Sequence, residues 1–206
     1  MKAYRVHEYG DAAKFIGEEV SKPSAKQGHV VVEVKASSLN PVDHKLLKCD
    51  LGINPALPGI LHMDVSGVIT EVGKGVTAFK TGDEIYGCAG GLQGEAGNIE
   101  GALADFMLAD SNLIALKPKS LSFSESAALP LVTITAWEGL FDRAHVKKED
   151  HVLIHGGTGG VGHIAIQLAK QHGARVATTV SSEEKAKIAR GLGAEDIILY
   201  RDEKVE

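Results

Sequence analysis

The chain has 206 residues, of which 44% are hydrophobic and 24% charged, and its formal net charge is −5. These proportions are typical of a soluble globular protein with one large or two small domains. The acidic balance and the lack of a basic cluster argue against a nucleic-acid partner, because binding to a phosphate backbone needs concentrated Lys and Arg.

The cysteines and the first residues of the chain predict the compartment. Cys49 and Cys88 are too few for a disulfide framework and suit a reducing environment. The start, Met1–Glu8, lacks the apolar stretch of a signal peptide. No run of about eighteen apolar residues could form a membrane span. We therefore expect a cytoplasmic protein with no membrane partner.

From residue 1 to about residue 120, short apolar segments alternate with Gly, Pro and Asp. Many short strands at close spacing predict an antiparallel barrel or sandwich. The glycine-rich segment Ala89–Gly101 is expected to be a surface loop. The expected strands are Ala3–Val6, Phe15–Val20, His29–Ala36, Gly67–Val72, Glu84–Cys88, Ala102–Ala109 and Leu113–Leu116.

The sequence pattern changes near residue 120. Ser122–Glu125 has the form of a capping box and starts an apolar helical run, which Pro130 should kink or restart. Strands and helices then alternate as a β-α-β-α-β unit, which predicts a parallel sheet. The fold class is therefore α/β plus β, with domains at residues 1–124 and 125–206. The expected elements are strand His151–His155, helix Val161–His172, strand Ala174–Val180, helix Ser182–Leu192 and strand Asp196–Leu199.

The turn between the first strand and helix of this unit matches the pattern G-x-G-x-x-G. In such a turn one glycine allows the tight bend, one lets the backbone approach a pyrophosphate, and one lets the helix pack on the strand. The amides and the positive dipole end of the helix then face the phosphates. The alternative is a tight strand-to-helix turn without a ligand. The expected dinucleotide contacts here are Gly157, Thr158, Gly159, Gly160, Val161 and Gly162.

The end of the second strand predicts which dinucleotide binds. NAD sites usually carry an Asp or Glu roughly 20 residues after the first glycine, to hold the ribose 2′-hydroxyl. Here no acid precedes Glu183. The hydroxyls of Thr179, Ser181 and Ser182 can donate to a 2′-phosphate, and Lys185 can neutralise it. The sequence therefore favours NADPH over NADH. In the alternative interpretation, Ser181 only caps a helix with Glu184, and Lys185 is a solvated side chain.

Several further motifs, together with the order of the two domains, resemble the medium-chain dehydrogenase/reductase superfamily. The branch concerned is that of the zinc-independent, alcohol dehydrogenase-like quinone oxidoreductases, and the resemblance covers the whole chain. It implies a GroES-like β-barrel catalytic domain followed by the first half of a Rossmann domain that binds NADP. The motifs that carry it are Leu39–Lys45, Met63–Ile69, Val72-Gly73 with Gly82-Asp83, Gly101–Phe106, Leu129–Trp137 and the glycine turn.

The resemblance implies roles for particular residues. Asn40 and Lys45 would line the cleft near the nicotinamide and its ribose, and Thr135 would touch the nicotinamide end. Ser181, Lys185 and Tyr200 would surround the adenosine 2′-phosphate. Without the resemblance, Lys45 would be interpreted as a surface lysine, and Asn40 as a turn residue before Pro41.

No metal site is expected. Where zinc-binding relatives carry Gly-His-Glu, this chain has His62, Met63 and Asp64, and a thioether is a poor zinc ligand. The usual first cysteine ligand is missing from residues 36–40, and the structural-zinc cysteines are missing from Ala89–Gly101. Recruitment of His62 as a ligand is the alternative.

The expected reaction is hydride transfer from NADPH to a quinone or an α,β-unsaturated carbonyl, without zinc. The conjugation of these substrates spreads the developing charge, and Lys45 is the candidate for polarising the carbonyl oxygen. Two alternatives stay open: a non-catalytic NADPH-binding protein, and a zinc alcohol dehydrogenase with atypical ligands.

The chain stops at Glu206, just after the third strand of the nucleotide-binding unit. A dinucleotide fold needs two such β-α-β-α-β halves. We therefore expect a fragment of a longer protein, with a truncated natural product as the alternative. The resemblance implies that the full-length protein is a homodimer.

Overall fold

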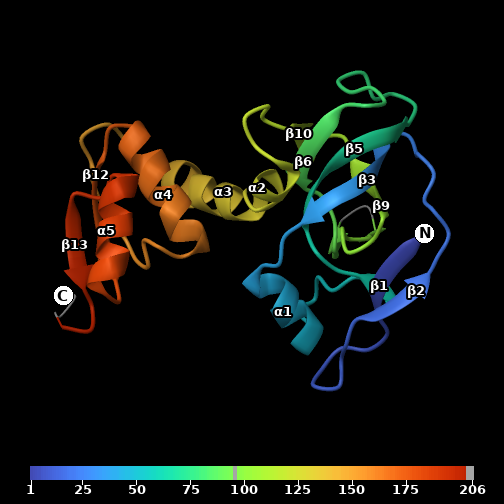
Figure 1. Ribbon diagram of the computed structural model, residues 1–206, viewed down its shortest axis with the longest axis horizontal. Helices are drawn as coiled ribbons and strands as arrows, with labels where there is room; N and C mark the ends of the chain where they lie inside the picture. Colours follow the sequence, from blue (N-terminus) through green and yellow to red (C-terminus); the bar gives the residue numbers. More distant parts are fainter. Residues whose placement is uncertain (95–96, 203–206) are drawn as a thin grey trace. The chain divides into compact units, whose positions relative to one another are not determined.

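The computed structural model describes residues 1–94 and 97–202, drawn in Figure 1. The chain forms two compact units, which we call the N-terminal unit (Met1–Leu131) and the C-terminal unit (from Val132 onward). The sequence pattern places the change of architecture slightly earlier, between residues 124 and 125. Each unit is described below by itself.

The N-terminal unit is built mainly from antiparallel strands, as predicted. Its main sheet has the order β10-β6-β5-β3-β9, and a smaller sheet has the order β2-β1-β4. In the main sheet all neighbouring strands run antiparallel. The strands are β1 (Lys2–Val6), β2 (Ile16–Glu19), β3 (His29–Ser37), β4 (Gly59–Ile60), β5 (Asp64–Val72), β6 (Glu84–Cys88), β9 (Phe106–Asp110) and β10 (Ile114–Leu116).

Buried residues of these strands form the core of the unit. Strand β3 buries three consecutive residues, Val30 to Val32, and β5 buries its first four, so both faces of the sheet are covered at these positions. Leu46 of the neighbouring helix and Leu61 add a second apolar cluster. The main cluster contains Val30, Val32, Val65, Ile69, Ile85 and Met107.

The expectation of a surface loop at Ala89–Gly101 is wrong. Within the described part of this segment, β7 (Leu92–Gly94) and β8 (Gly97–Ile99) form an antiparallel hairpin, and Ala89 and Gly101 are buried. A methyl group on Gly101 would overlap the carbonyl of Leu61. The glycines here mark close approaches of two backbones, whereas the sequence interpretation attributed them to solvent-exposed turns.

A short helix, α1 (Pro41–Lys48), was missed by the sequence analysis. Its start follows a recognisable rule, because Asn40 occupies the N-cap and Pro41 the first helical position. Only Asp43 and Leu46 of this helix are buried, so the apolar periodicity is too weak to reveal it. Strand β4 was missed as well, because two residues give no periodicity.

The linking segment confirms the predicted capping box and the restart at Pro130. The Ser122 hydroxyl accepts a hydrogen bond from Glu125 N–H at 3.2 Å, and Glu125 Oε2 accepts one from Ser122 N–H at 2.8 Å. Helix α2 (Phe123–Ala127) ends after five residues. Helix α3 (Pro130–Trp137) then begins at the proline and continues into a π-helical turn, Glu138–Arg143.

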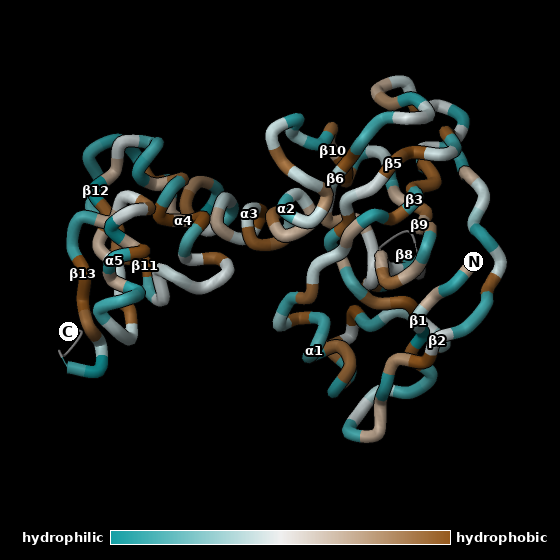
Figure 2. The backbone as a smooth tube through the Cα atoms, viewed as in Figure 1, coloured by the Kyte–Doolittle hydropathy of each residue, from teal (hydrophilic) through white to brown (hydrophobic). Residues whose placement is uncertain are grey.

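The C-terminal unit has the predicted β-α-β-α-β order. Strands β11, β12 and β13 form one parallel sheet in that order, and the apolar residues of β13 can be followed in Figure 2. The element bounds lie close to those expected, and β13 coincides with its prediction. The elements are β11 (His151–Ile154), α4 (Gly160–Gln171), β12 (Arg175–Val180), α5 (Glu183–Leu192) and β13 (Asp196–Leu199).

The core of the C-terminal unit lies between this sheet and its helices. Ile166 and Ala169 of α4 and Ala186 of α5 are fully buried, together with Val176 and Val180 of β12. Small alanines at these helix positions allow the helices to approach the strands closely. This packing fixes the start of α4 relative to the ends of the strands.

Candidate functional site

The glycine turn between β11 and α4 is shaped by close contacts within the C-terminal unit. Gly156 has a φ of 67°, in the left-handed region. A methyl group on Gly157 would overlap the Thr178 hydroxyl, and one on Gly162 would overlap the carbonyl oxygen of Gly156. The first and last glycines of the pattern are therefore required by the packing of the turn against β12 and against itself.

The start of α4 presents backbone donors. The first hydrogen bond within the helix runs from His163 N–H to the carbonyl of Gly159, at 3.1 Å. The amides of Gly160, Val161 and Gly162 therefore have no partner inside the helix. No side chain caps this helix end, and its first turn contains no acidic residue. The turn can thus accept an anion, and the helix dipole favours one there.

Thr179 of β12 forms a hydrogen bond with the turn, whereas its neighbour Thr178 forms one with strand β11. The Thr179 hydroxyl accepts a hydrogen bond from Gly156 N–H at 3.0 Å and lies 3.4 Å from Nδ1 of His155. The Thr178 hydroxyl donates to the carbonyl of Ile154 at 2.6 Å. Thr179, predicted as a cofactor contact, is only 3% exposed. The observed contacts of its hydroxyl are with the backbone of the turn and with the ring of His155.

The ends of β12 and β13 bring the predicted 2′-phosphate residues to one edge of the sheet. Val180 and Leu199 are paired in register, and Tyr200 N–H donates to the carbonyl of Val180 at 3.2 Å. Ser181 directly follows β12 and is half-buried, whereas Tyr200 is exposed. Ser181 and Tyr200 therefore follow adjacent strand ends, on the side of the sheet that carries the glycine turn.

Helix α5 begins one residue later than the alternative interpretation supposed. Its N-cap is Ser182, whose hydroxyl accepts a hydrogen bond from Lys185 N–H at 3.4 Å, so the assignment of the N-cap to Ser181 is wrong. Ser181 has no capping role that would compete with ligand binding. The Lys185 side chain lies exposed in the first turn of the helix.

The remaining predicted residues belong to other helices. Asn40 is 7% exposed at the N-cap of α1, where its N–H donates to Oδ2 of Asp43 at 2.7 Å. Lys45 is exposed further along α1, and its carbonyl accepts a hydrogen bond from Cys49 N–H at 2.9 Å. Thr135 is exposed on α3 of the C-terminal unit.

A buried polar cluster surrounds Asn40 in the N-terminal unit. Asp64, at the start of β5, is fully buried. Its Oδ2 accepts hydrogen bonds from the Ser38 hydroxyl at 2.7 Å and from Nδ2 of Asn40 at 2.9 Å. Burial raises the pKa of the Asp64 carboxyl, while these two hydrogen bonds lower it. Burying a charged group is costly unless donors surround it, as they do here.

His62 and Asp43 extend the cluster. The His62 backbone adopts a φ of 74°, and Nδ1 of its ring lies 3.1 Å from the Ser37 hydroxyl. Burial lowers the pKa of the His62 ring and raises the pKa of the Asp43 carboxyl, although the two groups attract each other when charged. No functional role was predicted for Asp43 or Asp64 from the sequence. The available signal was the single acidic residue, Asp64, in the mostly apolar segment Met63–Ile69.

The cluster does not provide a metal-binding arrangement. Within residues 1–94 and 97–202, no group of three or more His, Cys, Asp and Glu side chains could hold a metal ion. Met63 is 3% exposed and packs in an apolar cluster with Leu46 and Leu61. Burial, together with the nearby Asp64 carboxyl, raises the pKa of Cys88 to about 12. This thiol is therefore neutral at ordinary pH.

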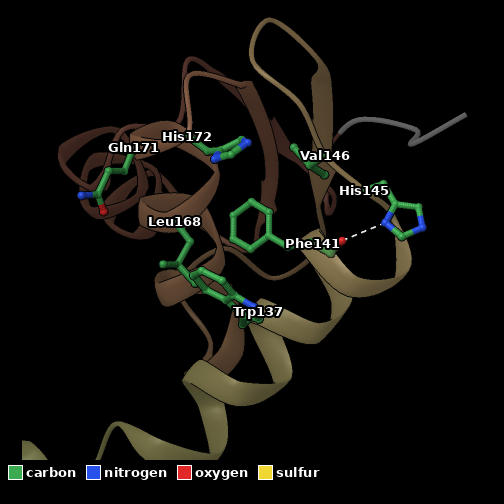
Figure 3. Close-up of a pocket in the computed structure, with 7 residues that line it drawn as sticks. All are labelled: Trp137, Phe141, His145, Val146, Leu168, Gln171 and His172. Atoms are coloured by element: carbon green, nitrogen blue, oxygen red, sulfur yellow. Dashed lines mark hydrogen bonds between the residues drawn. The ribbon is translucent and has the colours of Figure 1, made fainter.

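A separate pocket of about 520 Å³ lies in the C-terminal unit, as Figure 3 shows. Its walls include Trp137 and Phe141, whose ring centroids are 4.7 Å apart, and Leu168 and His172 at the far end of α4. The glycine turn is at the opposite end of this twelve-residue helix, about 18 Å away. The pocket is therefore distinct from the anion-accepting turn.

In the part of the chain that the structure describes, no helix is both long and apolar enough to cross a membrane.

Comparison with known proteins shows which families and which relatives the chain is similar to. Residues 26–119 match the alcohol dehydrogenase GroES-like domain, and residues 160–206 match the zinc-binding dehydrogenase family. Over its whole length the chain is 40% identical to a 2-methylene-furan-3-one reductase of Solanum lycopersicum. It is 37% identical, again over its whole length, to a chloroplastic NADPH-dependent alkenal/one oxidoreductase of Arabidopsis thaliana.

The solved structure of a quinone oxidoreductase from Coxiella burnetii is similar over 99% of this chain, with 34% identity and a TM-score of 0.83. The chain spans 54% of the length of each of the two curated relatives and 63% of that structure. The two domain matches, in the order found here, and this likeness in sequence and fold show that the chain belongs to the medium-chain dehydrogenase/reductase superfamily, where it is similar to the quinone oxidoreductases.

Proposed function

We propose that the complete protein is an NADPH-dependent oxidoreductase that reduces quinones or α,β-unsaturated carbonyls without zinc. The observation that carries the proposal is the glycine turn. The uncapped amides of Gly160, Val161 and Gly162 can donate hydrogen bonds to the pyrophosphate of a dinucleotide. The names of the relatives, which include an alkenal/one and a quinone oxidoreductase, support the choice of substrate class.

The residues of the C-terminal unit fit this cofactor. The turn leaves no room for side chains at Gly157 and Gly162, so the backbone itself forms the phosphate cradle. Thr158 and Gly159 complete the loop between the strand and the helix. Thr179 supports the cradle through Gly156 N–H. Thr135 on α3 is the proposed contact of the nicotinamide end.

NADPH is the proposed cofactor because of the groups at the end of β12. Ser181 follows the strand without a capping role, and Ser182 and Lys185 begin the adjacent helix. Tyr200 follows the neighbouring strand. Hydroxyls and an ammonium group suit a 2′-phosphate, which an acidic residue in the Ser181 position would repel. The NADPH dependence of the Arabidopsis thaliana relative supports this choice.

When bound, NADPH would supply the hydride, and the protein would supply orientation and a site that excludes water. Asn40 is held in a buried cluster, so its side chain is suited to orienting the bound cofactor. The exposed ammonium group of Lys45 is the candidate for interacting with the substrate oxygen. Quinones and enones suit such a site because their conjugation spreads the negative charge. The burial of Met63 in an apolar cluster supports chemistry without zinc.

The test is to measure cofactor binding, turnover and metal content of the full-length protein. We expect NADPH binding by fluorescence titration, NADPH oxidation with benzoquinone-type and enal acceptors, and no stoichiometric zinc. NADPH binding without turnover on any acceptor would favour a non-catalytic binding protein. Copurifying zinc together with ethanol oxidation would favour an alcohol dehydrogenase with atypical ligands.

Cofactor choice has its own test. Lys185→Glu should weaken NADPH binding about tenfold or more and change NADH binding much less, because only NADPH carries the 2′-phosphate. Lys187→Glu is the matched control, since Lys187 is an exposed lysine of the same helix with no proposed contact. Equal losses for both cofactors in Lys185→Glu would contradict the assignment.

A further inference from the structure

The side-chain hydroxyl of Thr179 links the glycine turn to His155. Its oxygen accepts a hydrogen bond from Gly156 N–H at 3.0 Å and lies 3.4 Å from Nδ1 of the His155 ring. These are the two hydrogen bonds that the hydroxyl makes within the described residues. A hydroxyl can accept with two lone pairs but has only one hydrogen to donate. The direction of each hydrogen bond therefore decides how Gly156, Thr179 and His155 depend on one another.

The chemistry of the three groups gives both directions. A backbone N–H only donates, so the Thr179 oxygen is the acceptor for Gly156. Thr179 is 3% exposed, and the hydrogen of a buried hydroxyl needs an acceptor of its own. Among the described residues that acceptor is Nδ1 of His155, which accepts when the ring is neutral and carries its hydrogen on Nε2. The hydrogen bonds therefore run from Gly156 through Thr179 to His155.

Thr179 fixes the backbone on both sides of Gly156. Gly156 N–H donates to the Thr179 hydroxyl, and Gly157 N–H donates to the Thr179 carbonyl at 3.1 Å. Gly156 has a φ of 67°, and because glycine has no side chain to restrict this angle, hydrogen bonds must hold it. The carbonyl of Gly156 accepts a hydrogen bond at 2.8 Å from the N–H of Gly159, the N-cap of α4. The Thr179 hydroxyl thus helps to set where the helix begins.

We propose that His155 is a positioning residue of the dinucleotide site, which acts by accepting the hydroxyl hydrogen of Thr179. The inference rests on the proposed function and deepens it. With this hydrogen directed to His155, a lone pair of the Thr179 oxygen stays directed at Gly156 N–H. The turn then keeps the shape in which the first amides of α4 meet a pyrophosphate. Because NADPH and NADH share the pyrophosphate, His155 supports the binding of both cofactors equally.

Two variants of His155 in the full-length protein test this role. His155→Leu replaces the accepting ring nitrogen by an apolar group, so the hydroxyl hydrogen of Thr179 loses its partner. We expect the Kd for NADPH and the Kd for NADH each to rise about fivefold, as for the weakening of one neutral hydrogen bond. His155→Asn keeps an acceptor oxygen close to the main chain, so it should bind both cofactors within about twofold of the wild type.

His151→Leu is the matched control, because His151 is an exposed histidine at the opposite end of β11 from the turn. It should leave both Kd values unchanged. A double variant tests the link to Thr179: His155→Leu with Thr179→Val should bind no more weakly than Thr179→Val, since both act through one contact. The proposal is overturned if His155→Leu binds like the wild type, if His155→Asn or His151→Leu binds as weakly as His155→Leu, or if the effects in the double variant multiply. A loss confined to NADPH would also overturn it.

The Gly156 amide reports the contact without a cofactor. Its hydrogen exchange with water, followed by NMR in the full-length protein without NADPH, should be slow in the wild type and in His155→Asn. It should be faster in His155→Leu and fastest in Thr179→Val, which removes the acceptor itself. Equal exchange in the wild type and His155→Leu would refute the positioning role. If exchange follows the expected order but the wild type binds neither cofactor, the proposed cofactor site fails, and with it the role of His155 in binding, while the contact with Thr179 stands.

Discussion

The two units hold their candidate functional atoms in opposite ways. In the N-terminal unit they are side chains buried among apolar strands, such as Asn40, Asp43, His62 and Asp64. In the C-terminal unit they are backbone amides at the start of α4, in a turn whose close contacts require glycine at Gly157 and Gly162. The first arrangement depends on hydrogen-bond partners, and the second on the absence of Cβ atoms. Substitutions should therefore harm the two units by different mechanisms.

The largest expected effect comes from adding a methyl group to the turn. Gly162→Ala would place a Cβ onto the carbonyl oxygen of Gly156 and should abolish measurable NADPH binding. It should also lower the free energy of unfolding by about 3 kcal/mol, the upper range for overpacking. Urea unfolding and fluorescence titration of the full-length protein would measure both.

Two further alanine variants test whether substitutions harm the two units by different mechanisms. Gly73→Ala would overlap the carbonyl of Lys26 in the N-terminal unit, so it should destabilise the protein similarly and leave NADPH binding intact. Gly191→Ala adds a methyl group to open space on α5 and should be neutral or slightly stabilising. If Gly73→Ala abolished NADPH binding, the separation of the two mechanisms would be wrong.

A smaller effect is expected from Thr179→Val, because it removes one hydrogen bond and keeps the shape. The amide of Gly156 would lose its acceptor, at a cost of about 1–2 kcal/mol of stability. The turn would also become less rigid, so the Kd for NADPH should rise several-fold. Thr178→Val is the control: its hydroxyl donates to Ile154 and does not contact a turn amide. Equal Kd values for the two variants would contradict a specific role of Thr179.

The site of the C-terminal unit could be predicted from the sequence better than that of the N-terminal unit. The reason is that its functional groups lie close together along the chain. A glycine turn between a strand and a helix is local, so its pattern can be recognised directly from Gly157 to Gly162. The parallel sheet follows from the alternation of elements, and the structure bears it out. The Asp64 contacts join residues far apart in the chain, with Leu131 and Asn40 as partners. No local periodicity encodes them.

One sequence interpretation failed where tertiary contacts decided the outcome, and one predicted site residue has a contact that the sequence did not suggest. The glycines of Ala89–Gly101 allow a buried backbone to approach Leu61, whereas composition alone suggested a loop. Thr179 was predicted as a cofactor contact from its place at the strand end, and this stays a prediction. The structure adds that it is 3% exposed and accepts a hydrogen bond from the turn. In both cases the residue type was correctly noticed, but its partner could not be deduced.

The smallest expected effect is a pH dependence that belongs to the N-terminal cluster. Burial lowers the pKa of His62, so below about pH 6.5 the unfolded chain binds a proton that the folded protein resists. Stability should therefore fall as the pH drops through this range. The raised pKa values of Asp43 and Asp64 act in the other direction, since their folded carboxyls take up protons more readily. Only a comparison of variants separates the contribution of His62 to the pH dependence from that of the two carboxyls.

His62→Asn removes the titrating ring and keeps a residue that tolerates the φ of 74°. Between about pH 7.5 and about pH 5.5, the variant should lose roughly 1 kcal/mol less stability than the wild type in urea unfolding. His145→Asn is the control, because His145 also has a positive φ, of 52°, but is exposed in the C-terminal unit. If the wild type and His62→Asn lost stability in parallel, the buried cluster would not be the pH-sensitive part of the molecule, and the contrast between the two units would rest on hydrogen bonding alone.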